Sequence, residues 1–452
     1  MSDGPVRVGE GVKAAGARYP DPISGAERIQ ELDVLRGFAI FGILLVNMAF
    51  FSTPLIYDLM AGTVRFGAPY DRLATWLIRF LAEAKFYTLF SFLFGLGLFV
   101  QMSRAEARGV AFVPLYIRRL LVLLLIGLTH AFLVWSGDIL VTYALLGFLL
   151  LLFRRRSPRA LLWWATAMLA MPLLFYALST LALAAGGASP EAAAQIERSF
   201  RETATSNTAR AEASVRAFGR GTFAEIMAQR TQDTLQSYAF LPLAAPNVLA
   251  MFLLGLYAGR RGVFRDIPGH LPLIRRVLVW GWGIGLAGNL LYATAQETTN
   301  RAVPTGLGLL AQAGQTLGAP ALCLGYAAGL VLLMQQASWR HRLAPLAAVG
   351  RMALSNYLLQ SLVCTTIFYS YGLGLFGQVG PAAGILLAIV IYLAQVPLSV
   401  WWLRRFQFGP AEWLSRSLTY LRRQPIKRAA VRLAGGDATP LSTTQSVTPS
   451  GR

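Results

Sequence analysis

The strongest candidate for chemistry in the chain is a histidine and a carboxylate on either side of a short turn. His130 lies near the end of one apolar run, Ser136-Gly137 follows that run, and Asp138 opens the next. Two helices joined at Ser136-Gly137 would bring His130 and Asp138 close together. A carboxylate beside an imidazole fixes its tautomer and stabilises the imidazolium, as a general base requires. The spacing equally suits a buried pair that only ties two helices together, and both interpretations stay open.

Two more polar side chains are expected near the same depth as this pair. Asn47 lies late in the first apolar run and Lys85 early in the second, so antiparallel packing places both toward one side. Polar groups are costly inside a bilayer, which makes each a functional candidate. Lys85 could pair with Asp138 or extend to the membrane surface, and the second is favoured. If His130 removes a proton, Asn47 or Lys85 could stabilise the developing oxyanion.

Other polar and small residues within the apolar runs are predicted to serve packing. The two cysteines have no partner nearby in sequence and no spacing typical of a metal site. Glycine pairs such as Gly95-x-Gly97 and Gly255-xxx-Gly259 permit close helix contact, and none belongs to a phosphate-binding fingerprint. Five amide side chains are predicted to hydrogen-bond between helices rather than bind a ligand: Asn289, Gln312, Asn356, Gln360 and Gln395.

The composition indicates which elements must position these residues. Of the 452 residues, 55% are hydrophobic and only 14% are charged, whereas soluble domains carry about 25% charge. Uncharged runs of membrane-spanning length recur along the chain. The composition therefore excludes a disordered chain, a disulfide scaffold and a nucleic-acid binder that is basic throughout.

The predicted fold is an all-α polytopic membrane bundle of about ten transmembrane helices. The fourth is short for a bilayer, so it is expected to be broken, re-entrant or buried among neighbours. The ten spans are expected near residues 34–53, 80–101, 117–135, 139–153, 160–186, 241–259, 277–296, 309–335, 345–371 and 381–403.

Arginines are distributed unevenly between the loops on the two sides. With the N-terminus in the cytoplasm, the inner connecting loops hold sixteen arginines and the four short outer loops hold four. Cytoplasmic loops carry the excess of cations in membrane proteins. Both termini are therefore predicted to be cytoplasmic, and topology accounts for much of the formal net charge of +20.

The long segment between the fifth and sixth spans divides the chain into two halves. Ser189-Pro190-Glu191 predicts a helix start, and Gly219 to Thr222 a break before a second helix. The segment is expected to form a helical cap outside the membrane or a solvated spacer. The predicted divisions are a disordered cytoplasmic tail (1–27), an N-terminal five-span half with the polar cluster (28–186), the extracytoplasmic helical loop (187–240), a C-terminal five-span half (241–408), an interfacial amphipathic helix (409–428) and a disordered tail (429–452).

Several motifs resemble those of YeiB-like bacterial membrane proteins, whose C-terminal domain is of unknown function. Together they extend over residues 28–425, nearly the whole predicted folded chain. The motifs are Arg28 to Ile40 followed by Leu44-Leu45-Val46-Asn47, Lys85-Phe86 with Leu89 to Gly97, His130 to Leu140 with Tyr143 to Gly147, Gly350 to Tyr357, and Gly409 to Trp413.

That family is similar to membrane-embedded acyltransferases, including the acyltransferase-3 enzymes and heparan-α-glucosaminide N-acetyltransferase. The resemblance implies a bundle in the bacterial cytoplasmic membrane that passes acyl groups from cytoplasmic acyl-CoA, such as acetyl-CoA, to an acceptor on the far side. This chain departs from the relatives: Asn47 stands eleven residues after Arg36, where acyltransferase-3 enzymes have a histidine. The region near Asp58, which corresponds to the heparan enzyme's catalytic histidine, has none either.

The resemblance suggests roles for residues at the inner mouth. Arg36, Arg118 and Arg119 would suit the phosphates of CoA, although the bias of cations toward the cytoplasm explains them equally. The acceptor would be a glycan, a lipid or a small molecule, with no metal and no nucleic acid involved.

The sequence is compatible with three functions: a transmembrane acyltransferase, a transporter or permease of a small solute or lipid, and a non-catalytic membrane scaffold. An acyltransferase needs a basic inner mouth joined to His130 by a narrow tunnel. A transporter needs a closed site near the midplane. A scaffold would show Asn47, Lys85, His130 and Asp138 fully paired, with no void between them.

Overall fold

The computed structural model describes residues 29–187, 189–299 and 303–427, and every named secondary-structure element within these ranges is an α-helix. In these ranges, eight helical segments are long and apolar enough to cross a membrane. The prediction of an all-α membrane helix bundle is therefore confirmed. The expectations for the tails 1–27 and 429–452 lie outside the described residues.

The N-terminal half supplies four of the eight long apolar segments, one of them formed by α3 and α4 together. α6, which corresponds to the predicted fourth span, has only 13 residues and is short as expected. The helices are α1 (Gln30–Ser52), α2 (Leu55–Ala61), α3 (Pro69–Leu81), α4 (Phe86–Ala107), α5 (Phe112–Leu133), α6 (Leu140–Leu152) and α7 (Pro158–Gly186).

The segment between the halves is helical, and it breaks at the predicted glycines. The Ser189 hydroxyl accepts a hydrogen bond from the Ala192 amide at the start of α8, and Thr222 forms a capping box with Glu225 at the start of α9. The remaining helices are α8 (Pro190–Arg220), α9 (Phe223–Ala239), α10 (Leu241–Arg260), α11 (Ile267–Thr298), α12 (Gly306–Leu333), α13 (Ala337–Arg351), α14 (Ala353–Phe368), α15 (Pro381–Arg405) and α16 (Pro410–Tyr420).

The ninth predicted span is not one helix, which corrects the sequence-based boundary of 345–371. The chain leaves helical geometry at Met352, between α13 and α14. Glu412 of α16 accepts hydrogen bonds from the amides of Leu354 and Ser355, at 2.7 and 3.2 Å. This carboxylate satisfies amide groups that a new helix start leaves without intrahelical partners. A residue 58 positions later in the chain therefore stabilises the break.

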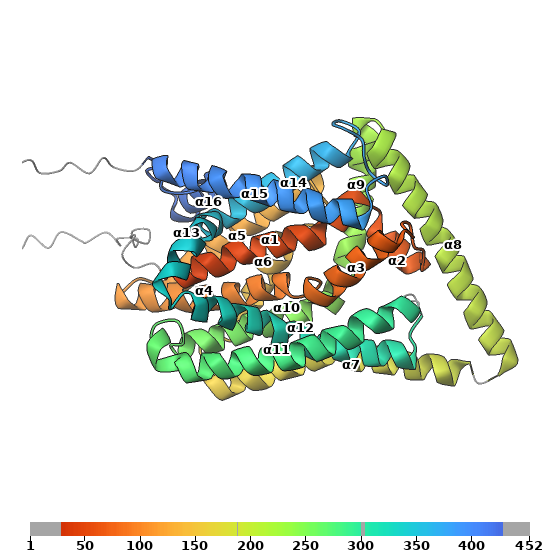
Figure 1. Ribbon diagram of the computed structural model, residues 1–452, viewed down its shortest axis with the longest axis horizontal. Coiled ribbons are helices and arrows are strands. Elements are labelled where there is room, and N and C mark those ends of the chain that lie inside the picture. Colours follow the sequence, from red (N-terminus) through yellow and green to blue (C-terminus); the bar gives the residue numbers. More distant parts are fainter. Residues whose placement is uncertain (1–28, 188, 300–302, 428–452) are drawn as a thin grey trace, which may run out of the picture.

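The helices form an elongated bundle whose two ends differ in structure (Figure 1). The start of α1 lies at the same end as α16, whereas α2, α8 and α9 gather at the opposite end. α8 crosses that opposite end at a steep angle to the bundle. The largest buried apolar cluster includes Phe51 of α1, Trp135 of the α5–α6 turn, Phe218 of α8 and Tyr357 of α14. Residues from both halves of the chain therefore share one core near the α8–α9 end.

Glycines allow two of these helices to touch, as the sequence predicts. A Cβ at Gly95 of α4 would lie 1.9 Å from the Phe252 carbonyl oxygen, and one at Gly255 of α10 would lie 1.9 Å from that of Phe92. No side chain larger than hydrogen fits at such a distance. The contact joins α4 in the N-terminal half to α10 in the C-terminal half.

Candidate functional site

His130 and Asp138 meet at the turn that joins α5 to α6. His130 lies in the last turn of α5, and its Nδ1 is 2.7 Å from Asp138 Oδ2. The other carboxylate oxygen, Oδ1, accepts the Val141 amide at 2.9 Å and thereby caps α6. The His130 residue is only 2% exposed. The structure thus brings together the pair that the Ser136-Gly137 turn predicts.

The second nitrogen of His130 has no such partner. An ionised carboxylate can only accept, so the bond to Asp138 places the proton on Nδ1 and leaves a lone pair on Nε2. Nε2 is buried and has no hydrogen-bond partner among the described residues. The Tyr357 ring lies against the imidazole, with 5.2 Å between ring centroids. An imidazole with Nδ1 held and Nε2 unoccupied has the arrangement of a general base.

A narrow cavity adjoins the turn that carries this pair. Its walls include Trp135, Ser136 and Gly137 of the turn, Tyr57 of α2 and Asp233 of α9. Trp135 also stacks on Phe51 of α1, with 3.9 Å between ring centroids. The cavity is about 40 Å³ in volume, enough for only a few water molecules. A substrate that reaches His130 by this route must widen the cavity.

Helix α9 contacts the last turn of α5, which the sequence analysis did not anticipate. Arg230 Nη1 donates to the Leu133 carbonyl at 2.7 Å, and the Thr234 hydroxyl donates to the Ala131 carbonyl at 3.2 Å. Arg230 is 1% exposed, yet its Nε and Nη2 have no hydrogen-bond partner among the described residues. Ile226, Arg230 and Thr234 follow at four-residue spacing and share one face of α9. That spacing was the available signal for a buried face, whereas the sequence-based expectation for this segment was only a cap outside the membrane or a solvated spacer.

Asp233 of α9 forms a second buried acidic site on the cavity wall. Its Oδ1 accepts hydrogen bonds from the Tyr57 hydroxyl and the Gln229 amide, both at 2.8 Å. Burial of the carboxylate raises the pKa of Asp233 to about 6, while the two hydrogen bonds act in the opposite direction. The group therefore titrates near physiological pH.

Lys85 occupies neither of the two positions that the sequence analysis considered. Its side chain is fully buried at the junction of α3 and α4, and its Nζ donates to the Arg79 carbonyl at 2.6 Å. It therefore neither pairs with Asp138 nor extends to the surface. Ala84 has a left-handed backbone with φ of 67°, which breaks the helix there. The ammonium group satisfies a carbonyl at the end of α3, where a cation is favourable.

Asn47 lies on α1, on the same side of the helix as a residue that contacts the α5–α6 turn. It is half-buried on α1, four residues before Phe51, so the two share one side of the helix. Phe51 stacks on Trp135, which follows His130 in the turn. The side of α1 that carries Asn47 therefore faces toward the α5–α6 turn.

The three arginines predicted to bind CoA lie near the starts of α1 and α5. Arg36 Nη1 is 3.0 Å from Asp33, Arg118 is half-buried and Arg119 is exposed. Arg36 and Arg119 lie close enough for their charges to repel each other. Arg118 and Arg119 lie in the second turn of α5 and His130 in its last turn, so about 17 Å of helix separates them. Neither of the two cavities described for this structure is lined by any of the three arginines.

In the described part of the chain, no group of three or more His, Cys, Asp or Glu side chains could hold a metal ion. The two cysteines, Cys323 of α12 and Cys364 of α14, are buried and free. The His130–Asp138 pair has the residue types and contact that acid–base chemistry requires.

The sequence matches a family described as "Protein of unknown function (DUF418)" over residues 258–422. It is 40% identical to the uncharacterized protein YxaH of Bacillus subtilis over 416 residues, which are 89% of this chain and 96% of the relative. It is 32% identical to the uncharacterized protein YeiB of Escherichia coli over 398 residues, which are 87% of this chain and 96% of the relative. The DUF418 match includes Tyr357 and Glu412, whereas His130 and Asp138 lie before it.

Proposed function

The chain belongs to the YeiB-like family of membrane proteins, and from this premise we propose that it is a transmembrane acyltransferase. It would take an acyl group from cytoplasmic acyl-CoA and transfer it to an acceptor on the opposite side of the bacterial cytoplasmic membrane. The observation that carries the proposal is the buried His130, with Nδ1 held by Asp138 and Nε2 unoccupied. In a scaffold, all four polar candidates would be paired.

The proposed reaction needs one base and balances without a metal. The acceptor hydroxyl or amine gives its proton to His130 Nε2 as it attacks the thioester carbonyl. The carbon–sulfur bond breaks, and the CoA thiolate takes the proton from the imidazolium to leave as a thiol. Asp138 stabilises the imidazolium between these steps. Asn47 is the proposed donor to the oxyanion, because Lys85 already donates to the end of α3.

The distribution of charge supports an orientation for this reaction. With both termini cytoplasmic, the ten proposed crossings are the eight long segments together with the shorter apolar helices α6 and α14. Arg36, Arg118 and Arg119 then lie on the cytoplasmic side, where the phosphates of CoA would relieve the repulsion between Arg36 and Arg119. α8 and α9 form the extracytoplasmic segment, and α16 lies on the inner membrane surface.

This orientation requires movement inside the bundle. The thioester must travel from the arginines near the start of α5 to His130 near its end, and neither described cavity joins them. The proposal therefore requires a path that opens when acyl-CoA binds.

The test compares wild-type protein with His130→Ala in detergent. Binding of acetyl-CoA and of a long-chain acyl-CoA is measured by calorimetry, and release of CoA thiol is followed in parallel with water as acceptor. Both proteins should bind, and removal of the base should slow thiol release by roughly 10²–10⁴-fold. His341→Ala is the matched control, because His341 is exposed on α13 and should leave the rate unchanged.

Two results would contradict the proposal. One is that folded wild-type protein binds no acyl-CoA. The other is that it releases thiol at the same rate with and without the His130 imidazole.

A further inference from the structure

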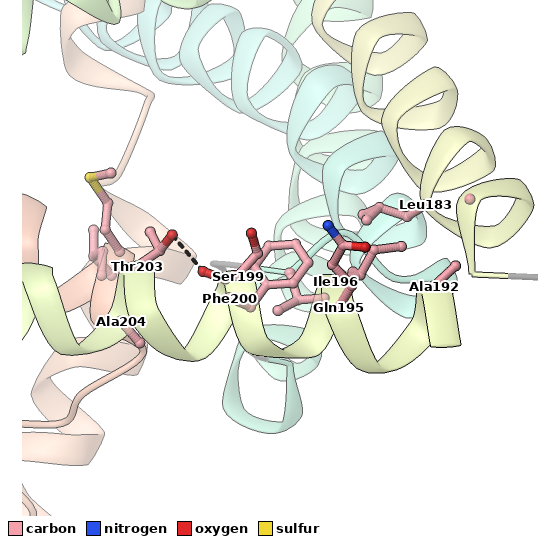
Figure 2. Close-up of a pocket in the computed structure, with 12 residues that line it drawn as sticks. Leu183, Ala192, Gln195, Ile196, Ser199, Phe200, Thr203 and Ala204 are labelled. Carbon is pink, nitrogen blue, oxygen red and sulfur yellow. Dashed lines mark hydrogen bonds between the residues drawn. The ribbon is translucent and has the colours of Figure 1, made fainter. Parts of the chain in front are cut away.

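The larger of the two cavities lies beneath α8, at the end of the bundle where α9 is also found. Its volume is about 890 Å³, within the range of roughly 300–1,000 Å³ typical of ligand pockets. α8 forms one wall, Leu183 and Gly186 at the end of α7 form another, and Leu59 and Met60 of α2 close one end. Figure 2 shows the α8 side chains rising from one side of the helix, with Leu183 of α7 beyond them.

The sequence of α8 accounts for this wall. Ala192, Ile196, Phe200 and Ala204 follow at four-residue spacing and form one apolar face of the helix. The same face continues into the second half of α8, where Asn207, Ala211, Ser214 and Phe218 are buried against the rest of the protein. In the first half, the face borders the cavity instead. The apolar face of the first half of α8 therefore borders an open cavity, whereas that of the second half packs against the protein.

The cavity wall carries no charge, although the helix is rich in charged residues. Glu197 and Arg201 pair with each other away from the cavity. The polar groups that face it are uncharged: Gln195, Ser199 and Thr203. The Thr203 hydroxyl is already bonded to the Ser199 carbonyl at 2.8 Å, as the dashed line in Figure 2 marks. These surroundings suit a hydrocarbon chain with a small polar end.

The cavity also adjoins the surface that faces the membrane. None of the most apolar window of α7 is buried, and its exposed Phe175 and Ala182 lie on the same side of the helix as Gly186, which lines the cavity. An exposed apolar surface of this length on a spanning helix lies against lipid chains. A lipid chain at the end of α7 therefore needs to cross no polar surface to enter the cavity.

We propose that this cavity binds the hydrocarbon tail of an amphiphilic lipid from the leaflet on the α8–α9 side. A lipid acceptor deepens the function proposed above and rests on it. α2 links the two sites, since Leu59 and Met60 face the large cavity whereas Leu55 and Tyr57 face the narrow one beside the His130 turn. A tail in the large cavity would place the reactive headgroup across α2, near the narrow cavity and His130.

The test uses phosphatidylethanolamine with a photoreactive diazirine at the end of one chain, in vesicles of phosphatidylethanolamine and phosphatidylglycerol. Full-length protein is irradiated, digested and analysed by mass spectrometry. Crosslinks should concentrate on the end of α7 and the first half of α8. Ala192→Trp, which fills the cavity, should lower them severalfold. Ala194→Trp is the matched control, because Ala194 lies on the opposite side of the same helical turn.

Crosslinks spread evenly over the lipid-facing helices, or unaffected by Ala192→Trp, would overturn the proposed lipid site. The experiment is repeated with His130→Ala, which should keep the crosslinks. Crosslinks at the cavity without thiol release by the wild type would contradict acyl transfer alone. Transfer to a water-soluble acceptor without crosslinks at the cavity would contradict the lipid site alone.

Discussion

Two buried polar clusters in this protein differ in how many of their donors and acceptors are hydrogen-bonded. Between α14 and α15, Gln360 Nε2 donates to Gln395 Oε1 at 2.8 Å, and Gln395 Nε2 donates to the Asn356 carbonyl at 3.1 Å. Asn356 Nδ2 donates to Ser399 Oγ at 3.0 Å. At the α5–α6 turn, by contrast, His130 Nε2 and the nearby Arg230 Nε and Nη2 are buried without partners.

The α14–α15 cluster joins two helices through paired amides, whereas the His130 cluster keeps buried polar atoms that have no partner among the described residues. Buried polar groups are nearly always paired, because an unpaired one costs about 1–3 kcal/mol. The α14–α15 amides meet that rule and contribute specific packing between helices. The His130 cluster bears the cost, which a ligand that supplies the missing partners would offset.

The largest expected effect is on activity, from Asp138→Asn. The amide oxygen can still cap α6, but the amide nitrogen facing Nδ1 favours the wrong imidazole tautomer. Thiol release should fall by roughly 10²–10⁴-fold while the protein stays folded. Asp71→Asn is the control, because Asp71 is also a buried carboxylate that caps a helix start, through the Ala382 amide. An equal loss of activity in both variants would make Asp138 a structural residue only.

A smaller effect, on stability rather than on activity, is expected from the titration of Asp233. The folded pKa of about 6 lies above the ordinary value of 3.8, so the folded state binds the proton more tightly than the unfolded chain. The contribution of this group to stability is full below pH 4 and is lost as pH rises through 6, by up to about 3 kcal/mol. Asp233→Asn should therefore be more stable than wild type at pH 7, and the difference should shrink toward pH 5. The midpoints of unfolding of the two proteins in detergent, measured from pH 5 to pH 7, give this stability difference. A difference that does not change with pH would contradict the raised pKa of Asp233.

The smallest effect is expected in the paired cluster, from Gln360→Leu. The change leaves Gln395 Oε1 without its donor and should lower the free energy of unfolding by about 1–2 kcal/mol. Thiol release by the folded fraction should not change. Gln312→Leu is a milder control, because Gln312 bonds only to Thr316 within its own helix. A loss of activity with Gln360→Leu would remove the distinction between the two clusters.

The parts of the candidate site that depend on neighbouring residues in the chain could be predicted from the sequence. The Ser136-Gly137 turn between apolar runs predicts the His130–Asp138 contact. Three of the five amides bond between helices or across a helix junction as predicted, whereas Asn289 and Gln312 bond within their own helices.

The features that depend on distant residues could not be predicted. The break at Met352 is stabilised by Glu412 of another helix. Lys85 is buried because it satisfies a carbonyl of the preceding helix, whereas its sequence position favoured a site at the membrane surface. Arg230 contacts a helix about a hundred residues earlier in the chain, and its charge resembled that of its solvent-exposed neighbours.

The central claim is that His130 presents an unprotonated Nε2 to a substrate. The chain has three histidines, so ¹⁵N labelling of histidine gives three imidazole spectra, and His130→Gln identifies the one from His130. The account predicts a neutral ring with the proton on Nδ1 and no proton on Nε2, whose signal shifts when acyl-CoA and an acceptor lipid are added. A proton on Nε2 in the resting protein, unchanged by both ligands, would contradict it.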